Sequence, residues 1–167
     1  CCILVGIFLG YLYIGKFGEI NARRKAYREV FNKYAGVDNV HVKTQDIRFR
    51  QEGEQMFGTS DLVLENERGA AMNDAVLYLN PGLRVTSLKD LEGNPVPFTR
   101  EEQVLVVGRT LAPGEEINLC MEYEGTIDEA VCYPDFSDKE YHDTHLLRFS
   151  RSPHTFYRHG GCYARVA

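Results

Sequence analysis

Potential zinc ligands are concentrated near the C-terminal end of the sequence. His142, His145, His154, His159 and Cys162 lie within 21 residues of one another, beside Asp135, Asp138 and Asp143. Imidazole and thiolate are good zinc ligands, and His142 and His145 could share a metal if they lay on a helix. The segment, however, has the pattern of loops and strands, in which residues three apart point to opposite faces. We therefore expect a His-rich surface loop, with a metal site as the alternative.

Three pairs of adjacent carboxylates are the next candidates for chemistry: Glu101-Glu102, Glu115-Glu116 and Asp128-Glu129. No basic or nucleophilic residue flanks them at a meaningful spacing, so we expect solvated turns. The sequence also lacks HExxH, CxxC, GxSxG, a phosphate-binding glycine loop and a calcium loop. We therefore assign no catalytic, cofactor-binding or metal-ligating residue, and we expect no cofactor in this chain.

The cysteines at positions 1, 2, 120, 132 and 162 show no metal-ligand spacing. Cys120 alternates with apolar residues of one predicted strand, and Cys132 follows twelve positions later. A disulfide between them is conceivable in an oxidising compartment. We expect free thiols and keep the disulfide as the alternative.

Charge divides the 167 residues into three zones. Residues 1–15 carry no charge, residues 16–36 hold six basic and two acidic residues, and residues 37–167 hold 13 basic and 22 acidic residues. The net charge of −5 makes a nucleic-acid partner unfavourable. The length and the 44% hydrophobic content suit one globular domain with an appendage.

The uncharged zone is the apolar sequence CCILVGIFLGYLYIG. It lacks the basic start and small-residue cleavage site of a signal peptide, and the polar tether that follows a lipoprotein cysteine. We expect residues 1–15 to be the end of a transmembrane helix with further residues upstream, and Tyr11 and Tyr13 to lie at the membrane interface. A buried hydrophobic helix is the alternative.

Residues 16–36 are predicted to form a basic amphipathic connecting helix. Ala22, Ala26 and Val30 recur at a spacing of four, and Gly36 is a typical helix stop. For the run 23–25 (Arg-Arg-Lys) we expect a solvated face, with contact to anionic headgroups or phosphate as the alternative. The basic charge would place this flank in the cytoplasm.

Beyond residue 36 the pattern changes to short strands separated by Gly and Pro turns. Apolar and polar residues alternate around residues 40–49, 61–66, 83–88 and 117–124, and apolar runs occupy 75–79 and 104–107. Such strands predict that 37–150 is all β, as an antiparallel sandwich or barrel-like sheet. The fold class is therefore mainly β, an antiparallel β-sandwich preceded by an N-terminal helix or helices.

Several of these strands and turns, in this order and spacing, resemble the N-terminal β domain of aminopeptidase N-like zinc metallopeptidases. The similar segments are 76–85 (VLYLNPGLRV), 91–93 (LEG), 97–100 (PFTR), 105–107 (LVV) and 111–128 (LAPGEEINLCMEYEGTID). The resemblance covers roughly residues 40–130. The preceding apolar and basic helices resemble bacterial membrane proteins that join a transporter-type permease to an aminopeptidase-like region.

The resemblance implies a saddle-like, non-catalytic β domain, 37–167, that forms one wall of the substrate cleft and is cut short at its C-terminus. Zinc and the catalytic residues would belong to a downstream catalytic domain of the same chain. Expected partners are that domain, the membrane through residues 1–15, and transporter subunits. The bacterial inner membrane is the expected location. Peptidase-like domains of transporters more often face outward, whereas the basic residues 16–36 favour the cytoplasmic side. The two indications conflict, so we do not assign the β domain to either side of the membrane. The alternative is a membrane-tethered β-sandwich that binds partners without peptidase activity.

Overall fold

The computed structural model describes residues 2–37 and 39–131 of the chain. One helix and seven strands are followed by a short 3-10 turn: α1 (Cys2–Tyr34), β1 (His41–Glu52), β2 (Gln55–Glu65), β3 (Ala75–Tyr78), β4 (Leu83–Asp90), β5 (Phe98–Glu101), β6 (Val104–Val107), β7 (Glu116–Gly125) and η1 (Glu129–Val131). The predicted fold class, antiparallel β with an N-terminal helix, is confirmed.

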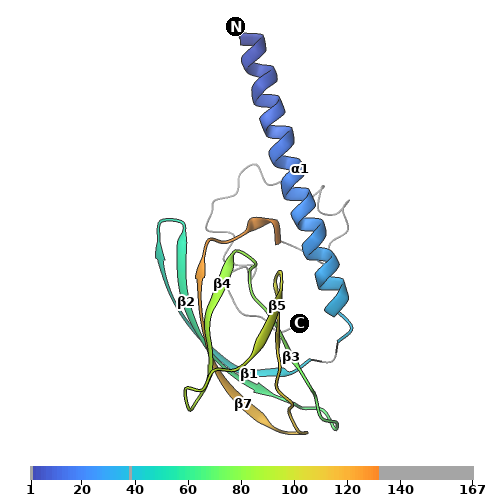
Figure 1. Cartoon of the computed structure of the whole chain (residues 1–167), viewed down its shortest axis with the longest axis vertical. Helices are drawn as coiled ribbons and strands as arrows, with labels where there is room; N and C mark the ends of the chain where they lie inside the picture. Colours follow the sequence, from blue (N-terminus) through green and yellow to red (C-terminus); the bar gives the residue numbers. More distant parts are fainter. Residues whose placement is uncertain (1, 38, 132–167) are drawn as a thin grey trace.

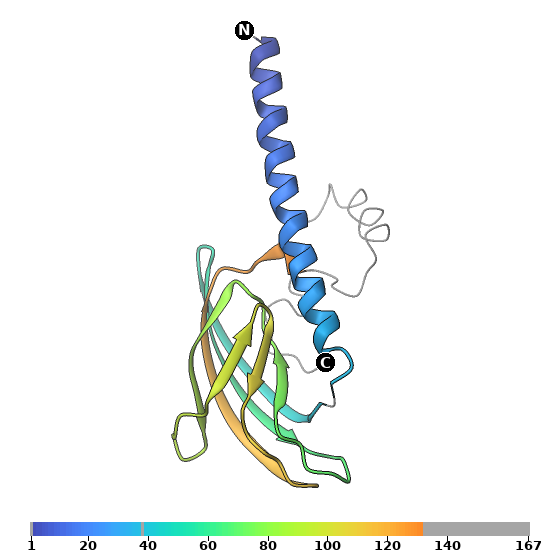
Figure 2. The ribbon, with the colours of Figure 1, turned by 45° about the vertical axis from the view of Figure 1, so that its right-hand side comes forward.

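The apolar zone and the basic zone form one continuous helix, α1, of 33 residues. No proline interrupts it, and Lys33 lies in its last turn, where the helix dipole favours a cation. The N-terminal half projects beyond the β domain, whereas the C-terminal half lies against it (Figures 1 and 2). Within the described residues, no helix combines the length and the apolar character needed to cross a membrane.

The larger sheet has four antiparallel strands in the order β1-β2-β7-β4. Its central strands alternate strictly: on β7, Ile117, Leu119, Met121 and Tyr123 are buried, while the residues between them face outward. This period of two explains why the sequence pattern located the strand to within one residue at each end. Bulges between Val42 and Thr44 and between Val85 and Ser87 shift the register of the two edge strands.

The smaller sheet has three antiparallel strands in the order β3-β6-β5. It is the middle layer of three, with the larger sheet on one face and α1 on the other (Figure 2). Leu77 and Leu105 point into the core between the sheets, whereas Val76 and Val104 face Val30 of α1. Burial on both faces explains the unbroken apolar runs in β3 and β6.

Candidate functional site

The predicted His-rich segment, including Cys162 and its neighbouring aspartates, lies outside the described residues, as does Cys132. Cys120 is a free thiol within the described part. Among residues 2–37 and 39–131, no group of three or more His, Cys, Asp or Glu side chains is arranged to hold a metal ion.

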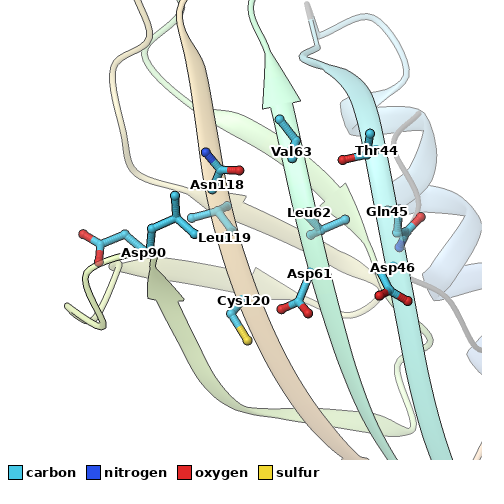
Figure 3. A pocket seen from close by; sticks show the side chains of 11 residues that line it. Thr44, Gln45, Asp46, Asp61, Leu62, Val63, Asp90, Asn118, Leu119 and Cys120 are labelled. Atoms are coloured by element: carbon cyan, nitrogen blue, oxygen red, sulfur yellow. The ribbon is translucent and has the colours of Figure 1, made fainter.

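A shallow pocket of about 250 Å³ lies on the face of the larger sheet that points away from the smaller sheet (Figure 3). Strands β1, β2 and β7 and the end of β4 line it, through Thr44, Gln45, Asp46, Asp61, Leu62, Val63, Asp90, Leu91, Asn118, Leu119 and Cys120. Ligand pockets are usually larger, roughly 300–1,000 Å³, and enclose most of their ligand. The pocket brings together polar residues that the sequence analysis did not single out as a group.

Two carboxylates of this pocket, those of Asp61 and Asp90, are occupied by contacts within the domain. Asp61 is paired with Arg48 and lies opposite Asp46 in the register of β1 and β2. Asp90 accepts hydrogen bonds from the backbone N–H groups of Asn94 at 2.9 Å and Glu92 at 3.0 Å. These bonds, chiefly the one from Asn94, lower the pKa of Asp90. Asp90 therefore stabilises the turn between β4 and β5 in its ionised form.

The surroundings of the Cys120 thiol beside them favour its protonated form. Burial raises the pKa of Cys120, and its hydrogen bond to Asp61 and the charge of that carboxylate raise it further. Since the thiolate is the nucleophile and the metal ligand, a raised pKa opposes both roles at neutral pH. The pocket holds no catalytic pair of nucleophile and base among the described residues.

The three acidic pairs lie only partly in turns, because Glu101 is the last residue of β5 and Glu116 is the first residue of β7. Several of their carboxylates are bonded to other parts of the chain. Glu101 accepts a hydrogen bond from Lys33 of α1 at 2.5 Å. Glu115 accepts one from the backbone N–H of Ala112 at 2.7 Å, and Glu116 is paired with Lys43. These contacts give the carboxylates structural roles.

Asp128 departs further from the expected solvated turn, because its side chain is only 12% exposed. One carboxylate oxygen accepts hydrogen bonds from Arg23 at 2.8 Å and from the Tyr27 hydroxyl at 2.7 Å. The other accepts the backbone N–H of Ala130 at 2.9 Å. The prediction was wrong here because the contact joins residues 105 positions apart in the chain.

The basic run also differs from the expected solvated face. Arg23 reaches Asp128, and Arg24 is buried with 4% exposure, whereas Lys25 is exposed. Arg24 lies three residues before the buried Tyr27 on the same side of α1, which faces the β domain. The prediction is therefore wrong for Arg24 and correct for Lys25.

Three of the segments that carry the family resemblance, 76–85, 97–100 and 111–128, meet at one point, which we call the loop-crossing cluster (Asn80, Gly82, Arg100, Gly125 and Asp128). The Asn80 side chain accepts the N–H groups of Gly82 at 3.0 Å and Asp128 at 2.8 Å, and donates to the Asp128 carbonyl at 3.0 Å. Arg100 donates to the Asn80 carbonyl at 2.9 Å. The chain therefore crosses itself here through hydrogen bonds of buried polar groups.

Glycine is required at this crossing because the two backbones touch. A Cβ atom on Gly82 would lie 1.9 Å from the Thr126 carbonyl oxygen, and one on Gly125 would lie 2.1 Å from the Gly82 oxygen. The Asn-Pro-Gly turn and the glycine that ends β7 are thus explained by packing. The sequence alone indicated a turn at residues 80–82 and did not indicate the contact with Gly125.

No protein-family model matches the chain, and no curated protein is significantly similar to it. Similar solved structures include the M1 zinc metallopeptidase from Deinococcus radiodurans, with 26% identity, 56% of this chain and 22% of that chain covered, and a TM-score of 0.47. A mutant of that enzyme bound to a Tyr-Ser-Ala substrate has 25% sequence identity, with 54% of this chain and 21% of that chain covered and a TM-score of 0.46.

The alignment thus spans about a fifth of the length of these metallopeptidases. TM-scores of 0.46 and 0.47 are too low to assign a family. What the structure itself defines is an antiparallel β domain of two sheets with a long N-terminal helix packed on the smaller sheet.

Proposed function

We propose that this chain is the N-terminal β domain of an aminopeptidase N-like zinc metallopeptidase and forms one wall of its substrate cleft without supplying catalytic residues. The observation that carries the proposal is the order of the resembling segments, 76–85, 91–93, 97–100, 105–107 and 111–128. They correspond to β3 through β7 and the loops between them, and three of them, 76–85, 97–100 and 111–128, meet in the loop-crossing cluster.

In this proposal, zinc belongs to a separate catalytic domain of the full-length protein. The test is the zinc content of that protein and its hydrolysis of an aminoacyl p-nitroanilide. We expect one zinc per chain, activity that is lost on chelation and regained with zinc, and no zinc bound by the present 167 residues alone. A full-length protein that is folded but free of zinc and inactive would support the alternative, a β-sandwich that binds partners without peptidase activity.

We also propose that residues 1–15 attach the β domain to a membrane, the bacterial inner membrane in a protein fused to a transporter-type permease. Residues 2–15 contain no charged residue, and Val5, Phe8 and Tyr11 are 56%, 60% and 75% exposed. Apolar residues on all sides of a helix favour an apolar environment all around it.

Membrane attachment and orientation have their own experiment. The full-length protein should remain with membranes after alkaline carbonate extraction. A protease site inserted at residue 40 should be cut by protease added to one side of the membrane only, and that side is the one on which the β domain lies. Release of the protein into the supernatant would refute membrane attachment and would leave the peptidase proposal unaffected.

A further inference from the structure

Helix α1 is joined to the β domain by two carboxylates that each bind one cation and one tyrosine of the helix. Asp128 accepts from Arg23 and Tyr27, as described above. Glu101, at the end of β5, accepts from Lys33 at 2.5 Å and from the Tyr34 hydroxyl at 3.0 Å. The two groups of contacts lie about two turns apart along α1, so they fix both its position and its direction.

The apolar contact between these two polar ends is a cluster of three buried valines with Tyr34, Tyr78 and Val106 packed against it. Val30 packs against Val76 and Val104 of the smaller sheet, and the rings of Phe31 and Tyr78 lie 5.9 Å apart. The main core of the domain, between the two sheets, does not include any residue of α1. A mixed polar and apolar contact of this kind is typical of interfaces that open and close, whereas permanent interfaces are larger and more apolar.

We propose that residues 23–34 of α1 are a releasable latch, which sets the direction of the N-terminal half of the helix relative to the β domain. The contacts described above all come from residues 23–34, whereas Val5, Phe8 and Tyr11 are more than half exposed. Because α1 is continuous from Cys2 to Tyr34, its N-terminal half follows the position of the latch. Opening the latch frees the helix while the two sheets stay folded.

The two ends of the latch differ in strength. The Asp128 side chain is 12% exposed and its bond from the Tyr27 hydroxyl is partly buried, whereas its partner Arg23 is 53% exposed. The side chains of Lys33 and Glu101 are 59% and 42% exposed, and ion pairs in that setting are weakened by salt. We therefore assign most of the free energy that stabilises the contact between α1 and the β domain to the Asp128 end.

Hydrogen exchange followed by mass spectrometry of the full chain tests the latch. We compare Asp128→Asn, Glu101→Gln and the double variant with Glu122→Gln, which removes one carboxylate charge from the exposed face of β7. We expect backbone amides of residues 23–34 to exchange about tenfold faster in Asp128→Asn and about threefold faster in Glu101→Gln. In the double variant these amides should exchange faster than in either single variant. The amides of β2 and β7 should exchange at the rate seen in Glu122→Gln.

Two results would overturn the latch. If amides of α1, β2 and β7 all accelerate by the same factor, the helix is a permanent part of one cooperative unit. If the α1 amides exchange as in the control, the carboxylates do not hold the helix. Should Asp128→Asn fail to fold, Arg23→Gln removes the same ion pair from its exposed side.

The direction of the helix can be followed separately, because the chain contains no tryptophan. A tryptophan introduced as Tyr11→Trp reports on the N-terminal half through its fluorescence anisotropy decay. When the latch is intact, we expect the anisotropy of this tryptophan to decay only with the tumbling of the whole molecule. In the double variant we expect an additional, faster component of the decay. An identical decay in both would contradict the latch.

Discussion

Burial and a neighbouring carboxylate determine the reactivity of Cys120. The thiol lies on β7 beside Asp61 of β2, and the register of the two strands places these residues opposite each other. Both burial and Asp61 raise the pKa of the thiol, so at neutral pH it is protonated. The sequence could only place Cys120 on the outward side of its strand, because its neighbour across the sheet comes from 59 positions earlier in the chain.

Replacing Asp61 with asparagine should increase the reactivity of Cys120. The change removes the charge and the carboxylate acceptor that raise the thiol pKa, while burial, the largest cause, stays in place. The lower pKa gives a larger thiolate fraction, and we expect alkylation by iodoacetamide at pH 8 to be about twofold faster. Peptide mapping by mass spectrometry separates Cys120 from the other cysteines.

Asp46→Asn is the matched control, because Asp46 lines the same pocket but does not act on the thiol. Its alkylation rate should equal that of the parent chain. Equal rates in both variants and the parent would show that Asp61 has no influence on Cys120.

The close approach of two backbone segments at Gly82 can be tested by substitution. In Gly82→Ala the new Cβ would lie 1.9 Å from a backbone oxygen, so two loops must separate. We expect the free energy of unfolding to fall by about 3 kcal/mol in urea titrations. Gly69→Ala, where a Cβ meets nothing within 4 Å, should change it by less than about 0.5 kcal/mol. Similar values for the two variants would contradict the close approach.

Helices and strands follow from the sequence wherever their periodicity depends on local residues. Alternation located β1, β4 and β7 and the second half of β2, and the two apolar runs located β3 and β6. The boundary expected between residues 15 and 16 does not interrupt α1, because the change from apolar to basic residues alters the surroundings of a helix without altering its backbone. The contact between α1 and the smaller sheet was not predictable, since it joins segments that share no local pattern.

The glycines of α1 weaken it next to the part that contacts the β domain. Gly18 lies in the helix with nothing within 4 Å of a Cβ position, so alanine fits there. Because glycine costs about 1 kcal/mol relative to alanine inside a helix, Gly18→Ala should slow amide exchange around residue 18 about fivefold. The reverse change at the exposed Ala22, Ala22→Gly, should accelerate exchange by a similar factor. Changes of the same sign in both variants would contradict a continuous helix here.

At the scale of the whole molecule, three layers are tied together by a few long-range polar contacts. Asp128 joins the loop-crossing cluster to α1, and Gln103, in the turn between β5 and β6, donates to the Tyr27 carbonyl at 2.6 Å. The composition and the strand pattern predicted a β domain with a helical appendage. They could not reveal that the C-terminal half of the appendage is the third layer, because its contacts depend on the folded positions of distant turns.

We have proposed that this β domain forms one wall of a peptidase cleft. The most direct measurement is hydrogen exchange of the full-length protein with and without an amino acid hydroxamate, an inhibitor that binds the catalytic zinc of aminopeptidases. We predict that the inhibitor slows exchange of amides within residues 39–131 as well as in the catalytic domain. Protection confined to the catalytic domain, at saturating inhibitor, would contradict a role of this domain in the cleft.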